Sequence, residues 1–92
     1  MHKFLIHKRG DHVGVATQDI SKNETVTGVY MDDNSSVEVT ARADIPLGHK
    51  IALVDLSPSD DVIEYGQVIG VTTSQWTVGD YVHTHNIKSK RW

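Results

Sequence analysis

The spacing of apolar residues is the feature that most constrains the fold of this 92-residue chain. No segment keeps apolar residues at positions i, i+3, i+4 and i+7 over three turns, which is the spacing typical of an amphipathic helix. Short runs rich in β-branched residues recur instead, and Gly, Asp, Asn or Ser residues separate them. This pattern predicts strands over residues 3–7, 13–17, 24–31, 36–41, 50–54, 61–64, 67–73 and 81–87.

A chain of this length forms one domain, which we expect to span residues 1–92. The clearest predicted hairpin joins residues 24–31 to residues 36–41 through the polar turn at 32–35. A small all-β domain has to protect its strand edges, so bent hairpins in a barrel-like or clip-like arrangement are favoured over an open sheet. The sequence therefore predicts a small all-β domain with little or no helix.

Composition excludes several functional classes. The chain has no cysteine, which excludes disulfides and cysteine-bound metals and agrees with the cytoplasm. No apolar run approaches the roughly 20 residues of a membrane span. The net charge of −3 argues against nucleic-acid binding. The aromatic residues are also not interleaved with basic residues, as they would be on an RNA-binding face. We therefore expect a cytoplasmic protein that binds neither membranes nor nucleic acids.

Two histidines stand one residue apart near the end of the sequence. In an extended strand, Tyr81, His83 and His85 would share one face, with neighbours about 6.6 Å apart. Two imidazoles at that spacing can bind an anion or a metal such as zinc, iron, copper or nickel, and the adjacent Asn86 can orient a hydroxyl or a carboxylate. The alternative is a solvated polar strand face. A metal would need further ligands: His49, Asp80, Glu64 or a second chain.

Other polar residues are weaker candidates. Gly48 can adopt a positive φ beside His49 and Lys50, which would face opposite sides of a strand. The same residues are consistent with a plain entry into a strand. The stretch around Tyr65 is equally consistent with a tight hairpin carrying a bulge, and His12 with a structural or solvated residue.

Three motifs in series carry a resemblance to a known family. They are DIPLGHKIAL at residues 44–53, VIEYGQVIG at 62–70 and GDYVHTHN at 79–86. Together they resemble the N-terminal SAF-type domain of the altronate/galactarate dehydratase family, over residues 4–88. The resemblance implies a β-clip fold. It also implies a part in the elimination of water from a 2,3-dihydroxy acid, with a divalent metal, iron(II), as cofactor.

Within this family, the short chain is most similar to the small (alpha) subunits of sulfolactate sulfo-lyases, which eliminate sulfite from 3-sulfolactate to give pyruvate. Family dehydratases continue into a large second domain, whereas this sequence stops at Trp92, which we interpret as a natural end. The resemblance implies a large dehydratase-like partner subunit that binds most of the metal, and a small chain that is inactive alone. The alternatives are a small subunit or N-terminal domain of a sugar-acid dehydratase, a non-catalytic sugar-acid-binding or assembly module, and an independent metal-binding protein built on the six histidines.

The site residues follow from the matched motifs and from side-chain chemistry. We expect a base to remove the proton α to the carboxylate and the leaving group to depart from the β carbon. The expected catalytic residues are His83, His85 and His49, and the first two are also candidate metal ligands. The expected substrate-binding residues are Lys50, Asn86, Lys88, Tyr65 and His12. Of these, the lysines would neutralise a carboxylate or a sulfonate.

Overall fold

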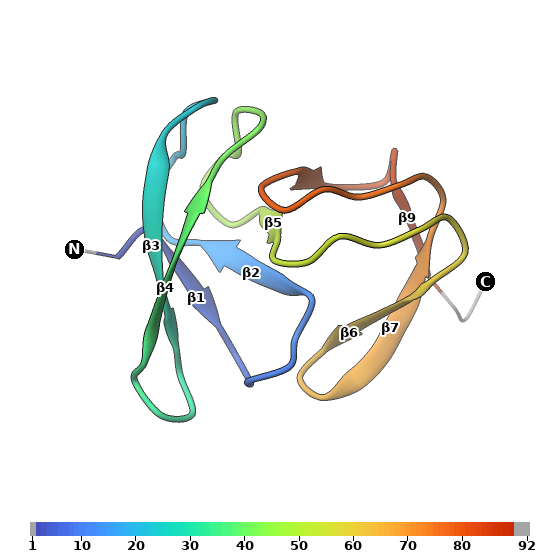
Figure 1. Ribbon diagram of the computed structural model, residues 1–92, viewed down its shortest axis with the longest axis horizontal. Coiled ribbons are helices and arrows are strands. Elements are labelled where there is room, and N and C mark those ends of the chain that lie inside the picture. Colours follow the sequence, from blue (N-terminus) through green and yellow to red (C-terminus); the bar gives the residue numbers. More distant parts are fainter. Residues whose placement is uncertain (1, 90–92) are drawn as a thin grey trace.

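Two sheets make up the chain, and they lie side by side in Figure 1. The computed structural model describes residues 2–89, so the basic end at residues 90–91 and Trp92 lie outside its description. The described residues include no helix, which confirms the prediction of a small all-β domain. Within the same residues, no helix has the length and apolar character needed to cross a membrane. The strands are β1 (Phe4–Ile6), β2 (Val13–Ala16), β3 (Thr25–Tyr30), β4 (Ser36–Thr40), β5 (Lys50–Ala52), β6 (Asp61–Glu64), β7 (Gln67–Thr72), β8 (Tyr81–Val82) and β9 (Ile87–Ser89).

The larger sheet has the strand order β4-β3-β1-β2-β5-β8. Strands β1 and β3 run parallel, and the other neighbours pair antiparallel. The hairpin β3–β4 confirms the one predicted around residues 32–35. Its alternation is also as predicted, because Val39 is buried while Glu38 and Thr40 are exposed.

The smaller sheet has the order β6-β7-β9. Tyr65 and Gly66 join its first two strands in a two-residue turn, with φ angles of 57° and 71°. Positive φ at both residues is typical of a hairpin turn that matches the right-handed twist of strands. The register shifts between Val62 and Ile63, because Ile69 lies between the paired residues of β7 without a partner in β6, so the predicted bulge is present on the strand after the turn.

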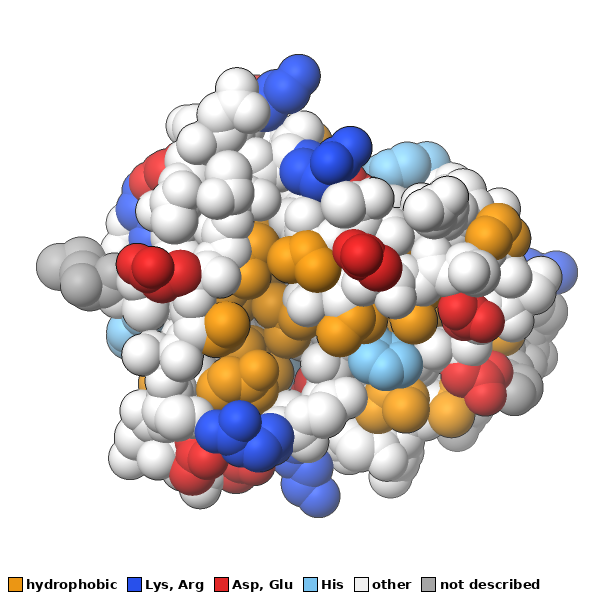
Figure 2. All heavy atoms as spheres, viewed as in Figure 1, with side chains coloured by type: hydrophobic (Ala, Val, Ile, Leu, Met, Phe, Trp, Pro, Cys, Tyr) orange, Lys and Arg blue, Asp and Glu red, His pale blue; other side chains and the backbone are white. Residues whose placement is uncertain are grey.

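Two apolar cores stabilise these sheets. The first lies on the larger sheet and includes Phe4, Ile6 and Ile51. The second contains Val13, Ala52 and Val82 from the larger sheet, Val62 from the smaller sheet and the fully buried Trp76. The second core therefore joins the two sheets. Figure 2 shows apolar side chains across the middle of one face, with charged side chains around them.

The predicted last strand over residues 81–87 is wrong. Strand β8 ends at Val82, residues 83–86 form a turn, and β9 begins at Ile87 in the other sheet. The chain thus crosses from one sheet to the other at the His-x-His motif. His83 and His85 consequently belong to a turn, and the strand-face spacing expected for them does not apply.

Candidate functional site

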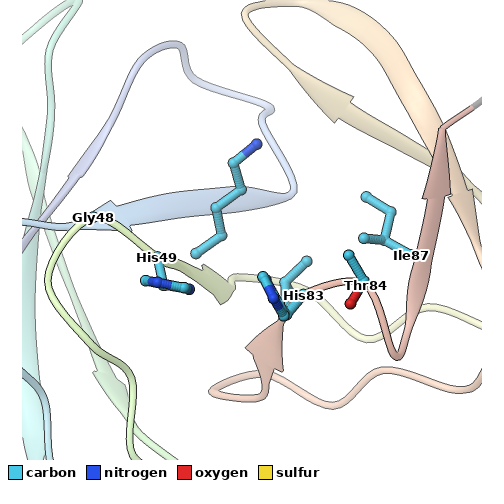
Figure 3. A pocket seen from close by; sticks show the side chains of 7 residues that line it. Gly48, His49, His83, Thr84 and Ile87 are labelled. Carbon is cyan, nitrogen blue, oxygen red and sulfur yellow. The ribbon is translucent and has the colours of Figure 1, made fainter.

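A pocket of about 330 Å³ lies where the chain crosses between the sheets. This volume is at the lower end of the range for small-molecule sites. Figure 3 shows His49 on one side, His83 near the middle, and Thr84 with Ile87 on the other side. The lining residues come from the turn before β5, from β5 and β8, from the turn after β8 and from the start of β9: Gly48, His49, Lys50, Val82, His83, Thr84 and Ile87.

The turn before β5 fixes the position of His49. Gly48 has a φ of +85°, which confirms the predicted positive φ at this glycine. Its N–H donates to the carbonyl of Ala16 (2.8 Å), and the N–H of Ala16 donates to the carbonyl of His49 (2.8 Å). The backbone on both sides of the His49 side chain is therefore bound to strand β2.

Four rings gather beside this pocket, with Tyr81 at their centre. Its ring centroid lies 5.5 Å from those of His49 and His83, and 5.8 Å from that of His85. The hydroxyl of Tyr81 lies 2.6 Å from Nδ1 of His49. The ring centroids of His49 and His83 are 5.2 Å apart. The predicted catalytic histidines are thus brought together, with His49 placed beside His83 by the fold.

Of the two predicted metal ligands, His83 lines the pocket and His85 does not. His49 and His83 line the same cavity, and imidazole is a suitable ligand for iron. Among residues 2–89, however, no three His, Asp or Glu side chains converge as metal ligands. The described residues alone do not fit a complete iron site, and we derive no chemical step through a metal from them.

Asn86 has a structural role that the sequence analysis missed. The residue is 5% exposed. Its Oδ1 accepts the N–H of His83 (3.0 Å), and its Nδ2 donates to the carbonyl of Tyr81 (2.8 Å). Its own carbonyl accepts the indole N–H of Trp76 (2.9 Å). The carboxamide that was expected to orient a substrate hydroxyl is therefore occupied in holding the turn at residues 83–86.

An ion pair connects the pocket to the smaller sheet. The ammonium of Lys50 donates to Oε1 of Glu64 (2.7 Å), whose side chain is only 5% exposed. Nε2 of His7 lies 3.9 Å from the other carboxylate oxygen, and the His7 ring stacks on the exposed Tyr65 at 3.9 Å between centroids. His7 was not predicted to support the site, and Glu64 was expected only as one of several further metal ligands, not as the partner of Lys50. The sequence pattern that could have indicated Glu64 is an acidic residue at an inward position of a strand, two residues after the buried Val62.

Of the five predicted substrate-binding residues, Lys50 lines the pocket, whereas Asn86, Tyr65, His12 and Lys88 lie outside its lining. Nδ1 of His12 accepts the N–H of Ile63 (3.1 Å), and the backbone N–H of His12 donates to the carbonyl of the same residue (2.8 Å). Lys88 is exposed on β9, where it pairs with Val71. His12 thus ties the β1–β2 connection to the smaller sheet, and Lys88 lies on an edge strand.

Comparisons with known proteins identify the family of this chain. Residues 2–90 match the family described as the altronate/galactarate dehydratase SAF domain. The chain is 36% identical over 90 residues to (2R)-sulfolactate sulfo-lyase subunit alpha of Chromohalobacter salexigens, covering 97% of this chain and 96% of that one. It is 52% identical over 64 residues to the subunit of the same name from Paracoccus pantotrophus, covering 70% and 96%. It is 34% identical over 90 residues to altronate dehydratase of Bacillus subtilis, covering 97% of this chain but 17% of that protein. The chain therefore belongs to the altronate/galactarate dehydratase SAF domain family.

Proposed function

We propose that this chain is the small subunit of a two-subunit carbon–sulfur lyase that converts 3-sulfolactate to pyruvate and sulfite. One observation carries the proposal: the alignment covers 96% of each of two sulfo-lyase alpha subunits, and only 17% of an altronate dehydratase. A subunit of a sugar-acid dehydratase is the second candidate, because altronate dehydratase is similar over 97% of this chain.

The pocket has the chemistry that such a substrate needs. 3-Sulfolactate carries a carboxylate and a sulfonate, and the pocket is lined by His49, His83 and Lys50, whose ammonium is paired with Glu64. Cations and N–H donors stabilise the negative charge that builds up on a carboxylate as its α-proton is removed. The electron pair of that C–H bond forms the C=C bond, and the C–S bond breaks with its electrons on sulfite. The resulting enol of pyruvate then takes up a proton on carbon.

A large partner subunit would supply the rest of the machinery. The imidazoles of His83 and His85 are exposed in this chain, and the described residues hold no three-ligand metal group. An iron(II) centre of the enzyme would therefore take most of its ligands from that partner. We expect the small chain alone to be inactive.

Reconstitution tests this proposal. The purified chain is assayed with 3-sulfolactate, with and without a co-expressed dehydratase-like large subunit, while pyruvate and sulfite are measured. Turnover is expected only with both subunits, and with 3-sulfolactate in preference to altronate or galactarate. Turnover by the small chain alone would contradict the two-subunit requirement, and preference for a sugar acid would favour the dehydratase.

Substitution of His83 separates a catalytic role from a purely assembling one. In the reconstituted complex, His83→Ala should lower turnover strongly, by roughly a hundredfold for a residue in general acid–base chemistry. Association of the subunits, measured by size-exclusion chromatography, should remain intact. Weakened association with unchanged turnover per complex would instead indicate a non-catalytic assembly module.

A further inference from the structure

Tyr81 occupies a position from which it can control the chemistry of His49. Tyr81 lies on β8 and pairs with Ile51 of β5, so its backbone is held beside the strand that His49 precedes. Its ring packs against the first apolar core, which limits its movement. From there its hydroxyl reaches Nδ1 of His49 at 2.6 Å.

We infer that Tyr81 is a positioning residue that donates its O–H to Nδ1 of His49 and thereby keeps the proton of the neutral imidazole on Nε2. The nitrogen of a histidine that carries the proton is set by the hydrogen bond at the other nitrogen. A phenol O–H is a stronger donor than a neutral imidazole N–H, and an imidazole nitrogen is a stronger acceptor than a phenol oxygen. The pairing O–H···Nδ1 is therefore favoured over Nδ1–H···O.

This tautomer gives His49 a specific task in the pocket. With Nδ1 occupied by Tyr81, Nε2–H is the group that His49 offers to a ligand. An N–H donor suits an oxygen of a carboxylate or a sulfonate, so His49 binds the anionic substrate and does not act as a base through that nitrogen. The identity of this ligand rests on the proposed function, whereas the tautomer itself does not.

Tyr81 also positions the neighbouring histidine. Its ring is almost parallel to that of His83, with an angle of 8° between the planes. One side chain therefore contacts both imidazoles that line the pocket, through its hydroxyl and through its ring face. The hydroxyl contact joins residues 32 positions apart in the sequence, which explains why local motifs did not indicate it.

The tautomer can be measured on the full chain without any substrate. Long-range ¹H–¹⁵N correlation spectra of histidine-labelled protein are recorded at a pH where the imidazoles are neutral, and His49→Gln identifies the signals of His49. We expect His49 to be protonated at Nε2 in the wild type. Tyr81→Phe, which removes only the hydroxyl, should shift His49 towards a mixture of tautomers. The matched control Tyr30→Phe should leave it unchanged.

The reconstituted enzyme provides the second readout. Loss of a well-ordered N–H donor to the substrate should raise KM for 3-sulfolactate by roughly fivefold in Tyr81→Phe. Protonation of wild-type His49 at Nδ1, or an unchanged tautomer in Tyr81→Phe, would overturn the inference. Because the spectra need no turnover, absence of lyase activity would overturn the proposed function and leave the tautomer result standing.

Discussion

At the scale of single residues, Asp11 shows how one carboxylate can organise two connections. The residue is 4% exposed, and its oxygens accept the backbone N–H groups of Lys8 (3.2 Å), Tyr65 (3.0 Å) and Gly66 (3.1 Å). The first belongs to the β1–β2 turn and the other two to the β6–β7 turn. Both turns flank the Glu64 carboxylate that binds Lys50. By binding both turns, Asp11 helps to hold this ion pair in place beside the pocket.

Asp11→Asn should destabilise the protein by about 2 kcal/mol. The amide keeps one acceptor oxygen but directs an NH₂ group at backbone donors, which leaves buried donors unpaired. Urea denaturation measures the change in the free energy of unfolding. The matched control is Asp55→Asn, because the exposed Asp55 accepts one backbone N–H, from Val78 at 2.9 Å. It should cost less than about 1 kcal/mol. Equal costs at the two sites would contradict this role for Asp11.

Most of the polar pocket residues could be predicted from the sequence, but the contacts between them could not. The pocket residues Gly48, His49, Lys50 and His83 were all found, because each lies in a motif and carries chemistry of its own. Tyr81 was placed beside His83 and His85, but its contact with His49 was missed because that contact depends on the pairing of β5 with β8. Pairing between distant strands cannot be obtained from the local alternation of one strand.

At the scale of strands and turns, most strands could be predicted because β-branched residues alternate between buried and exposed faces. The predicted strand at residues 81–87 failed because alternation says nothing about competing side-chain bonds. The carboxamide of Asn86 bonds to backbone groups of Tyr81 and His83, which offers the chain an alternative to a sheet. A motif that alternates can therefore still be a turn, and here the turn is what brings His83 to the pocket.

The turn before β8 depends on a glycine, which a pair of substitutions can test. Gly79 has a φ of +95°, and a Cβ added there would lie 2.1 Å from the carbonyl oxygen of Thr40. Gly10 has a φ of +94° but no atom within 4 Å of such a Cβ. Gly10→Ala should cost about 1 kcal/mol from backbone strain alone. Gly79→Ala should cost at least about 3 kcal/mol, because the backbone of β4 would also have to move. Equal losses in urea denaturation would show that the close approach is unimportant.

An ion pair joins the β1–β2 turn to the β3–β4 turn and gives the fold a pH dependence. The hydroxyl and the N–H of Ser35, together with the guanidinium of Arg9, lower the pKa of Asp33 from 3.8 to about 2. Because the pKa is lower in the folded chain, Asp33 stabilises the fold above its ordinary pKa of 3.8, and this contribution is lost as the pH falls towards 2.

Asp33→Asn should therefore be less stable than the wild type at neutral pH and equally stable near pH 2. Urea denaturation of both proteins over a series of pH values measures the difference. A difference that stays constant between pH 6 and pH 2 would show that the carboxylate charge of Asp33 is not its source.

At the scale of the whole molecule, the pocket exists because two sheets are held at a fixed separation. The second apolar core, which includes the fully buried Trp76, joins the two sheets. Polar links cross the same boundary. Lys50 on the larger sheet binds Glu64 on the smaller one, and His12 bonds to Ile63. Lys50 also lines the pocket, so the arrangement of the sheets and the charge in the pocket depend on the same ion pair.

The two partners of this ion pair should respond unequally to substitution. The Lys50 side chain is 36% exposed, whereas that of Glu64 is 5% exposed. Lys50→Met should cost about 2 kcal/mol, because it leaves a buried carboxylate without its ammonium partner. Glu64→Gln should cost about 1 kcal/mol, because the freed ammonium can turn to solvent. The double variant should be more stable than Lys50→Met alone.

The control is Lys3→Met, since Lys3 and Glu24 are both 31% exposed, and it should cost about 0.5 kcal/mol. In the reconstituted enzyme, Lys50→Met and Glu64→Gln should both lower kcat/KM, because Lys50 lines the pocket and Glu64 is its partner. Equal costs for Lys50→Met and Lys3→Met would show that the link between the sheets does not depend on this charge.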